Sequence, residues 1–408
     1  MLESAILVLV LILVCLGAAL LWYLRQMRLQ MHANLLEVHG ALESQLRGSL
    51  QAHMESLQAC RDEHVRVRSE FRRLRRHLNW WLSTEPDSAL PGNLAEAELL
   101  ALARNLAALR PLVPYPTWQF DRDWDNPDLL YRLRRAVWNH FRGDPQAPEL
   151  ILDWHHGTKL ALHLGNDLSK QIFVGGCMDP NELALLDKLL KPGMSFLDAG
   201  AMEGAYTVLA AALVGPGGVI WSVEPSARER RRLERNLERN GFRHVTVHPV
   251  ALADSDGKAE LKVARDEHSG QNTIGEVVYE QAREIMRETV EIRRLDSLAD
   301  EYGLKALDVV KMDIEGAEYR ALQGAEASIQ RFRPVILLEV FDEALEKQGG
   351  SRALLLSWLK EHGYDFYVFD YATARLRPDD GRIAGDNLVA VPVEKPLPAE
   401  AFSLLPRA

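Results

Sequence analysis

The most informative stretch of this 408-residue chain is Phe196-Leu197-Asp198-Ala199-Gly200-Ala201-Met202-Glu203-Gly204. A short apolar run ends at Asp198 and continues into a turn with two glycines, and an apolar helix pattern begins at residue 205. A buried strand, a glycine-rich turn and a helix in this order are typical of the first unit of a nucleotide-binding α/β sheet. Because glycines let a ligand approach the backbone, we expect Gly200 and Gly204 to lie at a cofactor site.

On both sides of this turn, short apolar strands alternate with amphipathic helices. The predicted strands cover 195–198, 219–223, 244–247, 309–313 and 335–339, and predicted helices cover 181–190, 205–214 and 226–240. This alternation predicts a Rossmann-like α/β fold, in which a mostly parallel sheet carries helices on both faces. In such folds, ligands bind beyond the carboxyl ends of the strands.

The second strand ends in an acid, Glu224, which comes 24 residues after Gly200. An acid at this position can accept hydrogen bonds from both hydroxyls of a ribose. The turn reads Gly-x-x-x-Gly rather than Gly-x-Gly-x-x-Gly, and the Asp198 carboxylate beneath it would repel a pyrophosphate. The pattern therefore favours S-adenosylmethionine, with Asp198 and Gly200 at its methionine end. The alternatives are that Asp198 caps the next helix and that Glu224 is a surface acid.

Four motifs resemble those of FkbM-type S-adenosylmethionine-dependent methyltransferases. They are Phe196–Gly204, Val223-Glu224-Pro225, Val310–Glu318 and Leu338-Glu339, and they follow the order of the family. The resemblance covers roughly residues 170–370. It implies a class I methyltransferase fold and O-methylation, commonly of sugar or natural-product hydroxyls. One position departs from the family pattern, since Met202 stands where an Asn is usual.

Two further acids are candidates for the chemistry. Asp313 and Glu339 end two of the predicted strands, and neighbouring strands of a sheet lie about 4.8 Å apart. Methyl transfer to a hydroxyl requires that a proton leave the attacking oxygen. We therefore predict Asp313 as the catalytic base, assisted by Glu339. The alternative is that both are helix caps or acids at the edge of the core.

The polar loop His268-Ser269-Gly270-Gln271-Asn272-Thr273 follows a predicted strand near 258–264. Its hydrogen-bonding side chains could clamp a polyhydroxylated acceptor, with Gln271, Asn272 and Thr273 as substrate-binding residues. His268 is the alternative base, and a solvated connecting loop is the alternative interpretation of the whole segment. The sequence predicts no metal site. Its three cysteines are dispersed, and the histidines within residues 25–82 are not one helical turn apart.

The chain begins with a predicted membrane span. Ser4–Leu24 is 21 residues long, contains no charge, and matches the roughly 30 Å thickness of a hydrocarbon core. Glu3 precedes the span, and Arg25 and Arg28 follow it, so the positive-inside rule places residues 25–408 in the cytoplasm. We expect a single-pass protein of the inner (cytoplasmic) membrane. A cleaved signal peptide, the alternative, would begin with basic residues and end at a small-x-small site.

Residues 25–82 lack proline and carry leucines at multiples of seven, which predicts a helical coiled-coil stalk and a possible homo-oligomer. A linker with short helices is predicted for 83–148, and the FkbM-like domain for 149–395. The net charge of −10 is borne by the body rather than by the basic stalk, which argues against nucleic acid as a partner.

Two other functional classes remain possible on these residues. One is a nicotinamide-dependent oxidoreductase, although the glycine spacing disfavours it. The other is a non-catalytic membrane-tethered scaffold, which Met202 favours and the retained acids disfavour. The residues do not identify the acceptor beyond a small molecule or glycan with a hydroxyl group.

Overall fold

The computed structural model describes residues 96–108, 129–275, 284–370, 373–380 and 386–404. All of them belong to one compact unit, Asp87–Ala408. The predicted span 4–24 and stalk 25–82 lie outside the described residues and stay predictions. Within the described ranges, no helix combines the length and apolar character needed to cross a membrane.

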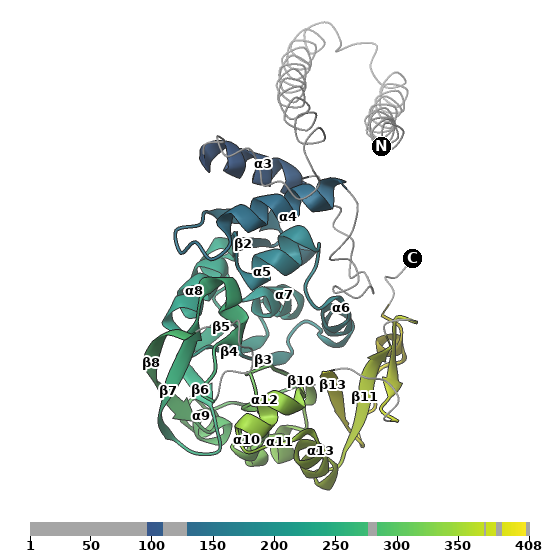
Figure 1. Ribbon diagram of the computed structural model, residues 1–408. Helices are drawn as coiled ribbons and strands as arrows, with labels where there is room; N and C mark the ends of the chain where they lie inside the picture. Colours follow the sequence, from purple (N-terminus) through teal and green to yellow (C-terminus); the bar gives the residue numbers. More distant parts are fainter. Residues whose placement is uncertain (1–95, 109–128, 276–283, 371–372, 381–385, 405–408) are drawn as a thin grey trace, which may run out of the picture. The chain divides into compact units, whose positions relative to one another are not determined.

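The core of the unit is an eight-stranded sheet with the order β12-β11-β13-β10-β9-β3-β4-β5 (Figure 1). Five strands form its parallel part: β3 (Ser195–Ala199), β4 (Val219–Val223), β5 (Val245–His248), β9 (Val309–Met312) and β10 (Val335–Glu339). Three antiparallel neighbours complete it: β13 (Asn387–Pro392), β11 (Tyr364–Asp370) and β12 (Arg375–Pro378). This is the class I methyltransferase-like α/β arrangement that the sequence predicts.

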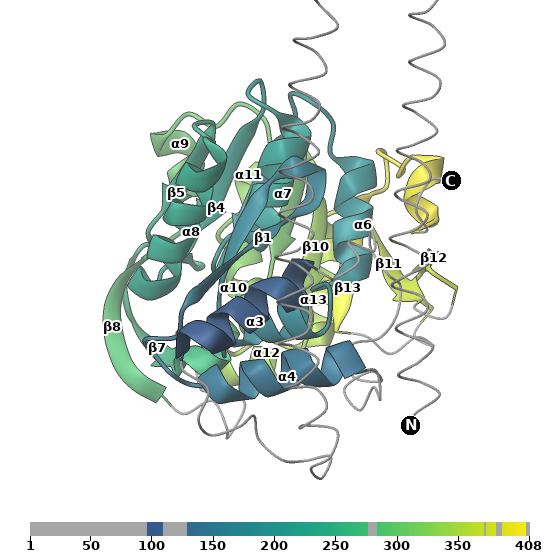
Figure 2. The same ribbon diagram turned by 90° about the horizontal axis from the view of Figure 1, so that it is seen from above.

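Helices cover both faces of the sheet (Figures 1 and 2). One face carries α6 (Pro180–Leu189), α7 (Ala205–Val214) and α8 (Ala227–Asn240). The other carries α9 (Leu295–Glu301), α10 (Glu318–Gln323), α11 (Glu326–Phe332), α12 (Asp342–Lys347) and α13 (Arg352–Glu361). Because side chains alternate along a strand, Leu197 and Ala199 enter the core beneath α9–α13, and Asp198 points toward α7.

A smaller sheet, ordered β6-β8-β7, lies beside the main one (Figure 2). It consists of β6 (Val250–Leu252), β7 (Gly257–Ala264) and β8 (Glu284–Arg293). The β7–β8 pair is antiparallel. The short helix η4 (Asp266–Gln271) follows β7 directly, so the small sheet supports the predicted polar loop.

The region before the main sheet is more closely integrated than a linker. Two helices, α3 (Glu96–Ala108) and α4 (Leu129–Phe141), contact each other, and α3 also contacts the hairpin of β1 (Glu149–Asp153) and β2 (Lys159–His163). The indole nitrogen of Trp138 donates to Asn166 O at 2.9 Å and to Ser169 Oγ at 3.1 Å. The described part of the predicted linker is therefore packed structure, and α4 supports the segment that contains α5 (Asp167–Ser169).

Replacement of Trp138 by Phe should lower the free energy of unfolding by about 1–3 kcal/mol, because buried acceptors lose their donor. Trp138 is only 3% exposed, so water cannot replace the indole. Chemical denaturation of the full chain measures the change. Tyr302→Phe is the matched control, since Tyr302 is 56% exposed and its hydroxyl is worth about 0.5 kcal/mol or less. Equal effects of the two substitutions would contradict the packed interpretation.

Candidate active site

A cavity of about 800 Å³ lies at the carboxyl edge of the parallel strands. The β3–α7 turn, the end of β4, the η4 loop and the ends of β9 and β10 contribute to its wall, together with residues of the preceding segment. Its lining includes Gly200, Met202, Glu224, His268, Gln271, Asn272, Asp313 and Glu339, which are predicted site positions or belong to the predicted motifs.

The two glycines of the turn have different roles. Gly200 lines the cavity at a φ of +79°, and a Cβ at this position would overlap the backbone oxygen of Asp313. Glycine is thus required for the close approach of the turn to the end of β9. Gly204, at a φ of +91°, would push a Cβ into Leu233 of α8. Gly204 does not line the cavity. The lack of a side chain at this position instead lets the start of α7 pack against α8.

Met202 occupies the left-handed region, with a φ of +52°. Asn and Gly adopt this conformation more readily than other residues. Met202, which departs from the family pattern, therefore adopts a strained backbone conformation. Its backbone nitrogen nevertheless donates to Glu224 Oε2 at 2.9 Å, which fixes the turn against the end of β4.

Glu224 is buried, with 5% of its surface exposed, so the surface-acid alternative is wrong. Its two oxygens accept from the backbone nitrogens of Met202 and Ser226, each at 2.9 Å. Burial raises the pKa of Glu224 to about 8, and the neighbouring Glu229 carboxylate contributes in the same direction. The acid lines the cavity beside the glycine turn, where hydroxyl donors of a ligand would stabilise its ionised form.

Asp198 is fully buried beneath the turn, and it contacts both the hydroxyl and the backbone of Thr207 in the first turn of α7, as the helix-cap alternative predicts. Its Oδ2 accepts from Thr207 Oγ1 at 2.6 Å, whereas Oδ1 has no partner among the described residues. Burial raises the pKa of Asp198, and the Lys311 ammonium opposes this shift. Asp198 is not part of the cavity wall. The Glu224 carboxylate does line the cavity, and it is an acceptor that fits the donor groups of S-adenosylmethionine.

The structure brings Asp313 and Glu339 together at one edge, because β9 and β10 are parallel neighbours. Lys311 Nζ donates to Asp313 Oδ2 at 3.1 Å. Burial lowers the pKa of Lys311, but the surrounding carboxylates, Asp313 first among them, produce a net rise. Burial and the charge of Asp313 raise the pKa of both Glu315 and Glu339. The edge is thus a crowded carboxylate cluster around one ammonium.

The η4 loop lies over the glycine turn, since a Cβ on Gly270 would contact Met202 Cε at 3.6 Å. His268, Gln271 and Asn272 line the cavity as expected. The loop is not a solvated connection, because Asp266 and Ser269 are buried. Two buried oxygens in its part of the wall, Ser269 Oγ and Gln271 Oε1, have no partner among the described residues.

Thr273 requires a correction. The residue is 4% exposed and is not among the residues that line the cavity. Its hydroxyl donates to Glu315 O at 3.2 Å and accepts from Gly275 N at 3.0 Å. These contacts fasten the loop to the turn after β9, so Thr273 supports the site rather than facing an acceptor.

Sequence analysis missed the residues that the preceding segment contributes to the cavity. Asp167, Lys170, Gln171 and Asp179 all line it. Asp179 directly precedes α6, but its side chain does not cap the helix. Its Oδ2 instead accepts from the Tyr206 hydroxyl at 3.0 Å. In the part of the chain that the structure describes, no group of three His, Cys, Asp or Glu side chains could hold a metal.

Residues 198–366 match the family model of the methyltransferase FkbM domain. The match begins at Asp198 and includes Glu224, Asp313 and Glu339. It confirms the resemblance drawn from the sequence motifs.

Two curated relatives each match less than half of the chain. The AMB antimetabolite synthetase AmbE of Pseudomonas aeruginosa is 28% identical over 212 residues, which cover 44% of this chain and 10% of AmbE. The 2-O-methyltransferase NoeI of Sinorhizobium fredii is 28% identical over 186 residues, 42% of this chain and 73% of NoeI. The matched part is thus only a tenth of the length of AmbE. The solved structure of methyltransferase FkbM from Methylobacillus flagellatus aligns at 16% identity and a TM-score of 0.32, covering 74% of this chain and 63% of that one.

Met202→Asn should raise the free energy of unfolding by about 1 kcal/mol, because a left-handed conformation costs most residues roughly 1–2 kcal/mol and Asn less. Chemical denaturation of the full chain measures it. Met194→Asn is the matched control, since Met194 is similarly half-buried but is not among the positive-φ residues. A stability gain no larger at 202 than at 194 would show that the turn carries no strain that Asn relieves.

Proposed function

We propose, on the premise that residues 198–366 are a methyltransferase FkbM domain, that this chain is a membrane-anchored S-adenosylmethionine-dependent O-methyltransferase. Its acceptor in this proposal is a sugar, glycan or related polyhydroxylated molecule. One observation carries the proposal: the cavity joins a glycine turn and the buried acid Glu224 to a wall of acids and amides at the strand ends. The first half suits an adenosine-bearing cofactor, and the second suits hydroxyl groups.

The cofactor assignment is supported by charge. S-Adenosylmethionine supplies an electrophilic methyl group on a sulfonium cation. The buried carboxyls of Glu224, Glu315 and Glu339 all have raised pKa values because burial disfavours their charged forms. A cationic ligand would stabilise these charges, whereas the pyrophosphate of a nicotinamide cofactor would add to the repulsion. Within the site, Glu224 would hold the ribose, and Gly200 would let the ligand approach the backbone.

The acceptor assignment is supported by the part of the cavity that the η4 loop and the ends of β9 and β10 line. Gln271 and Asn272 of the loop lie in the same wall as Asp313 and Glu339, and all four side chains exchange hydrogen bonds readily with hydroxyls. Transfer to oxygen is also the activity in the name of NoeI, the 2-O-methyltransferase that this chain resembles over 42% of its length. The proposal includes no nucleic-acid partner.

The location is part of the same proposal and depends on the sequence before the described residues. The uncharged stretch 4–24 would anchor the protein in the inner membrane, and the stalk 25–82 would allow homo-oligomers. Arg25 and Arg28 would keep the catalytic body in the cytoplasm. There it would act on acceptors at or near the membrane surface.

S-Adenosylmethionine should bind about tenfold more tightly at pH 9 than at pH 7, after correction for the titration of the ligand. The sign follows from Glu224, whose pKa of about 8 leaves it mostly protonated at pH 7. Ribose hydroxyls donate to the carboxylate, so binding releases a proton and strengthens as the pH rises through 8. Isothermal calorimetry on the full chain in detergent measures the affinity.

Glu224→Gln is the test variant, and Glu234→Gln, an exposed position on α8, is its matched control. Loss of hydrogen bonds to a charged group, worth about 1.5–3 kcal/mol, should weaken binding at pH 9 by roughly 10- to 150-fold in Glu224→Gln only. The pH dependence of binding that remains in Glu224→Gln comes from titration of the ligand. The difference between the wild-type curve and this curve gives the contribution of Glu224. Identical curves for wild type and Glu224→Gln would remove Glu224 from the cofactor site.

Protease added to sealed spheroplasts should leave residues 25–408 intact, because the proposed orientation places them on the cytoplasmic side. Permeabilised cells are the control, in which the same protease should digest the body. Digestion in sealed spheroplasts would contradict the topology, and recovery of the protein in the soluble fraction would contradict the anchor.

A further inference from the structure

A buried network joins the η4 loop to the segment that precedes the matched domain. Its centre is Arg232 on α8, whose Nη1 and Nη2 donate to the two oxygens of Asp266 at 2.6 and 2.8 Å. Nη1 also donates to Glu203 Oε1 at 2.9 Å. All three side chains are at least nine-tenths buried. A bidentate pair of this kind fixes the direction of both partners and not only their distance.

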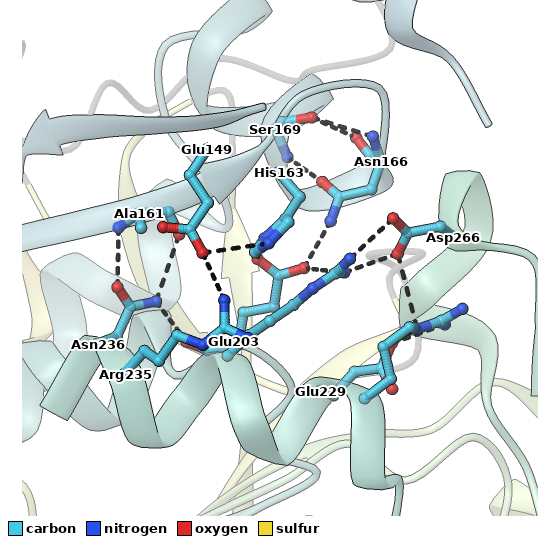
Figure 3. Close-up of polar contacts among 12 residues, drawn as sticks. Glu149, Ala161, His163, Asn166, Ser169, Glu203, Glu229, Arg235, Asn236 and Asp266 are labelled. Atoms are coloured by element: carbon cyan, nitrogen blue, oxygen red, sulfur yellow. Dashed lines mark hydrogen bonds and ion pairs between the residues drawn. The ribbon is translucent and has the colours of Figure 1, made fainter. Parts of the chain in front are cut away.

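The other end of the network is Asn166 (Figure 3). Its Nδ2 donates to Glu203 Oε1 at 2.5 Å, and its Oδ1 accepts from Ser169 N at 2.9 Å in a capping box at the start of α5. Figure 3 shows the Glu203 carboxylate joined to the Asn166 side chain, with Asp266 farther along the same network. The glycine turn, the preceding segment and the η4 loop are therefore held in one arrangement.

The network places two cavity residues opposite each other. Asp167 follows Asn166 directly, and His268 lies two residues after Asp266. Asp167 Oδ2 is 3.6 Å from His268 Nδ1, and the side chains are 27% and 16% exposed. Both residues line the cavity. The distance is slightly long for a hydrogen bond, as catalytic contacts often are before a substrate is bound.

We propose that His268 is the base that accepts the acceptor proton and that Asp167 is its positioning residue. This inference rests on the proposed O-methyltransferase function and assigns the proton transfer within it. Asp167 would hold the proton on Nδ1 and leave Nε2 to accept, the division of labour found wherever a carboxylate orients a catalytic imidazole. As the acceptor oxygen bonds the methyl carbon, the carbon–sulfur electron pair goes to sulfur and the hydroxyl proton goes to His268 Nε2.

The charges around the pair are consistent with this role. Burial raises the pKa of Asp167 to about 6, against the opposing effects of His268 and Lys170, so Asp167 is ionised at pH 7 and able to accept from Nδ1. Glu267 Oε1 lies 3.8 Å from His268 Nε2, while its Oε2 accepts from Arg142 at 3.1 Å. Glu315 is the remaining carboxyl that interacts with Asp167 across the cavity.

Asp313 is less suited to take the proton, because Lys311 Nζ already donates to its Oδ2. In this arrangement Asp313 and Glu339 bind acceptor hydroxyls, and the proton leaves toward the loop. Asp167 lies outside residues 198–366, so the preceding segment would supply a residue that the chemistry needs.

The first experiment follows methyl transfer from labelled S-adenosylmethionine to a panel of methyl glycosides, with the full chain in detergent. His268→Gln should lower kcat by about 10²- to 10⁴-fold, the usual contribution of a general base. Asp167→Asn should lower it by about tenfold, shift the acid limb of the kcat profile to lower pH and leave the KM for S-adenosylmethionine unchanged. Asp167→Glu should restore part of the rate, and Glu234→Gln, at an exposed position of α8 outside the cavity wall, is the control with little effect.

The second experiment needs no turnover. Diethylpyrocarbonate modifies the neutral imidazole, and mass spectrometry reports its rate at His268 as a function of pH. Loss of the Asp167 carboxylate should move the midpoint at His268 to lower pH by about half a unit or more, while Glu267→Gln should move it less.

The outcomes separate the two proposals. An active wild type whose His268→Gln or Asp167→Asn variant keeps its rate and pH profile overturns the pair, and a rate loss confined to Asp313→Asn moves the base to the strand edge. A wild type that transfers no methyl to any glycoside contradicts the proposed acceptor class. The pair is then decided by the modification experiment: an unchanged midpoint in Asp167→Asn, or an equal shift in Glu267→Gln, overturns it.

Discussion

The arrangement of the cavity depends on one buried guanidinium. Arg232 reaches from α8 to Glu203 in the glycine turn and to Asp266 at the start of the η4 loop. Taking these charges out of water is expensive, and the cost is offset only if the ion pairs have good geometry and further hydrogen bonds. Asn166 supplies such a bond to Glu203. Three segments far apart in sequence are thus fixed relative to one another around the cofactor turn.

The same principle of desolvation governs the interior of the cavity. Several acids surround the buried ammonium of Lys311. Burial raises the pKa of Asp179, Glu315 and Glu339. Carboxyl groups gathered in this way disfavour one another's ionised forms, because like charges resist desolvation together. Binding of a cation is the simplest way to relieve that repulsion. The electrostatics therefore fit the proposed cofactor better than they fit any anionic ligand.

Local patterns were enough to predict the sheet. Strands β3, β4, β9 and β10 are short, mainly apolar runs bounded by glycine, proline or acids, and the turn at Gly200 and the buried acid Glu224 fall where the pattern places them. The contacts that could not be predicted join residues far apart in sequence. The pairing of Arg232 with Asp266 and the approach of Asp167 to His268 depend on how α8, α5 and η4 meet in space. No periodicity or spacing in the sequence predicts how these three elements meet.

The errors have the same origin. Thr273 has the chemistry of a substrate ligand, but its hydroxyl faces the turn after β9, a direction that composition does not reveal. The linker with short helices predicted for 83–148 gave no indication of how α4 packs, and α4 supplies the indole of Trp138 that supports Asn166. At Met202 the structure explains a feature of the sequence. The positive φ at this position gives a backbone reason for the Asn that is usual in the family.

The central claim is that Arg232 couples the preceding segment to the η4 loop, and hydrogen–deuterium exchange on Arg232→Lys tests it most directly. Lysine keeps the charge but cannot form the two parallel bonds to Asp266. The account predicts that backbone amides of 166–170 and 266–272 lose protection together, while those of β3, β4 and β9 keep theirs. Loss of protection in only one of the two segments, or in neither, would contradict the coupling.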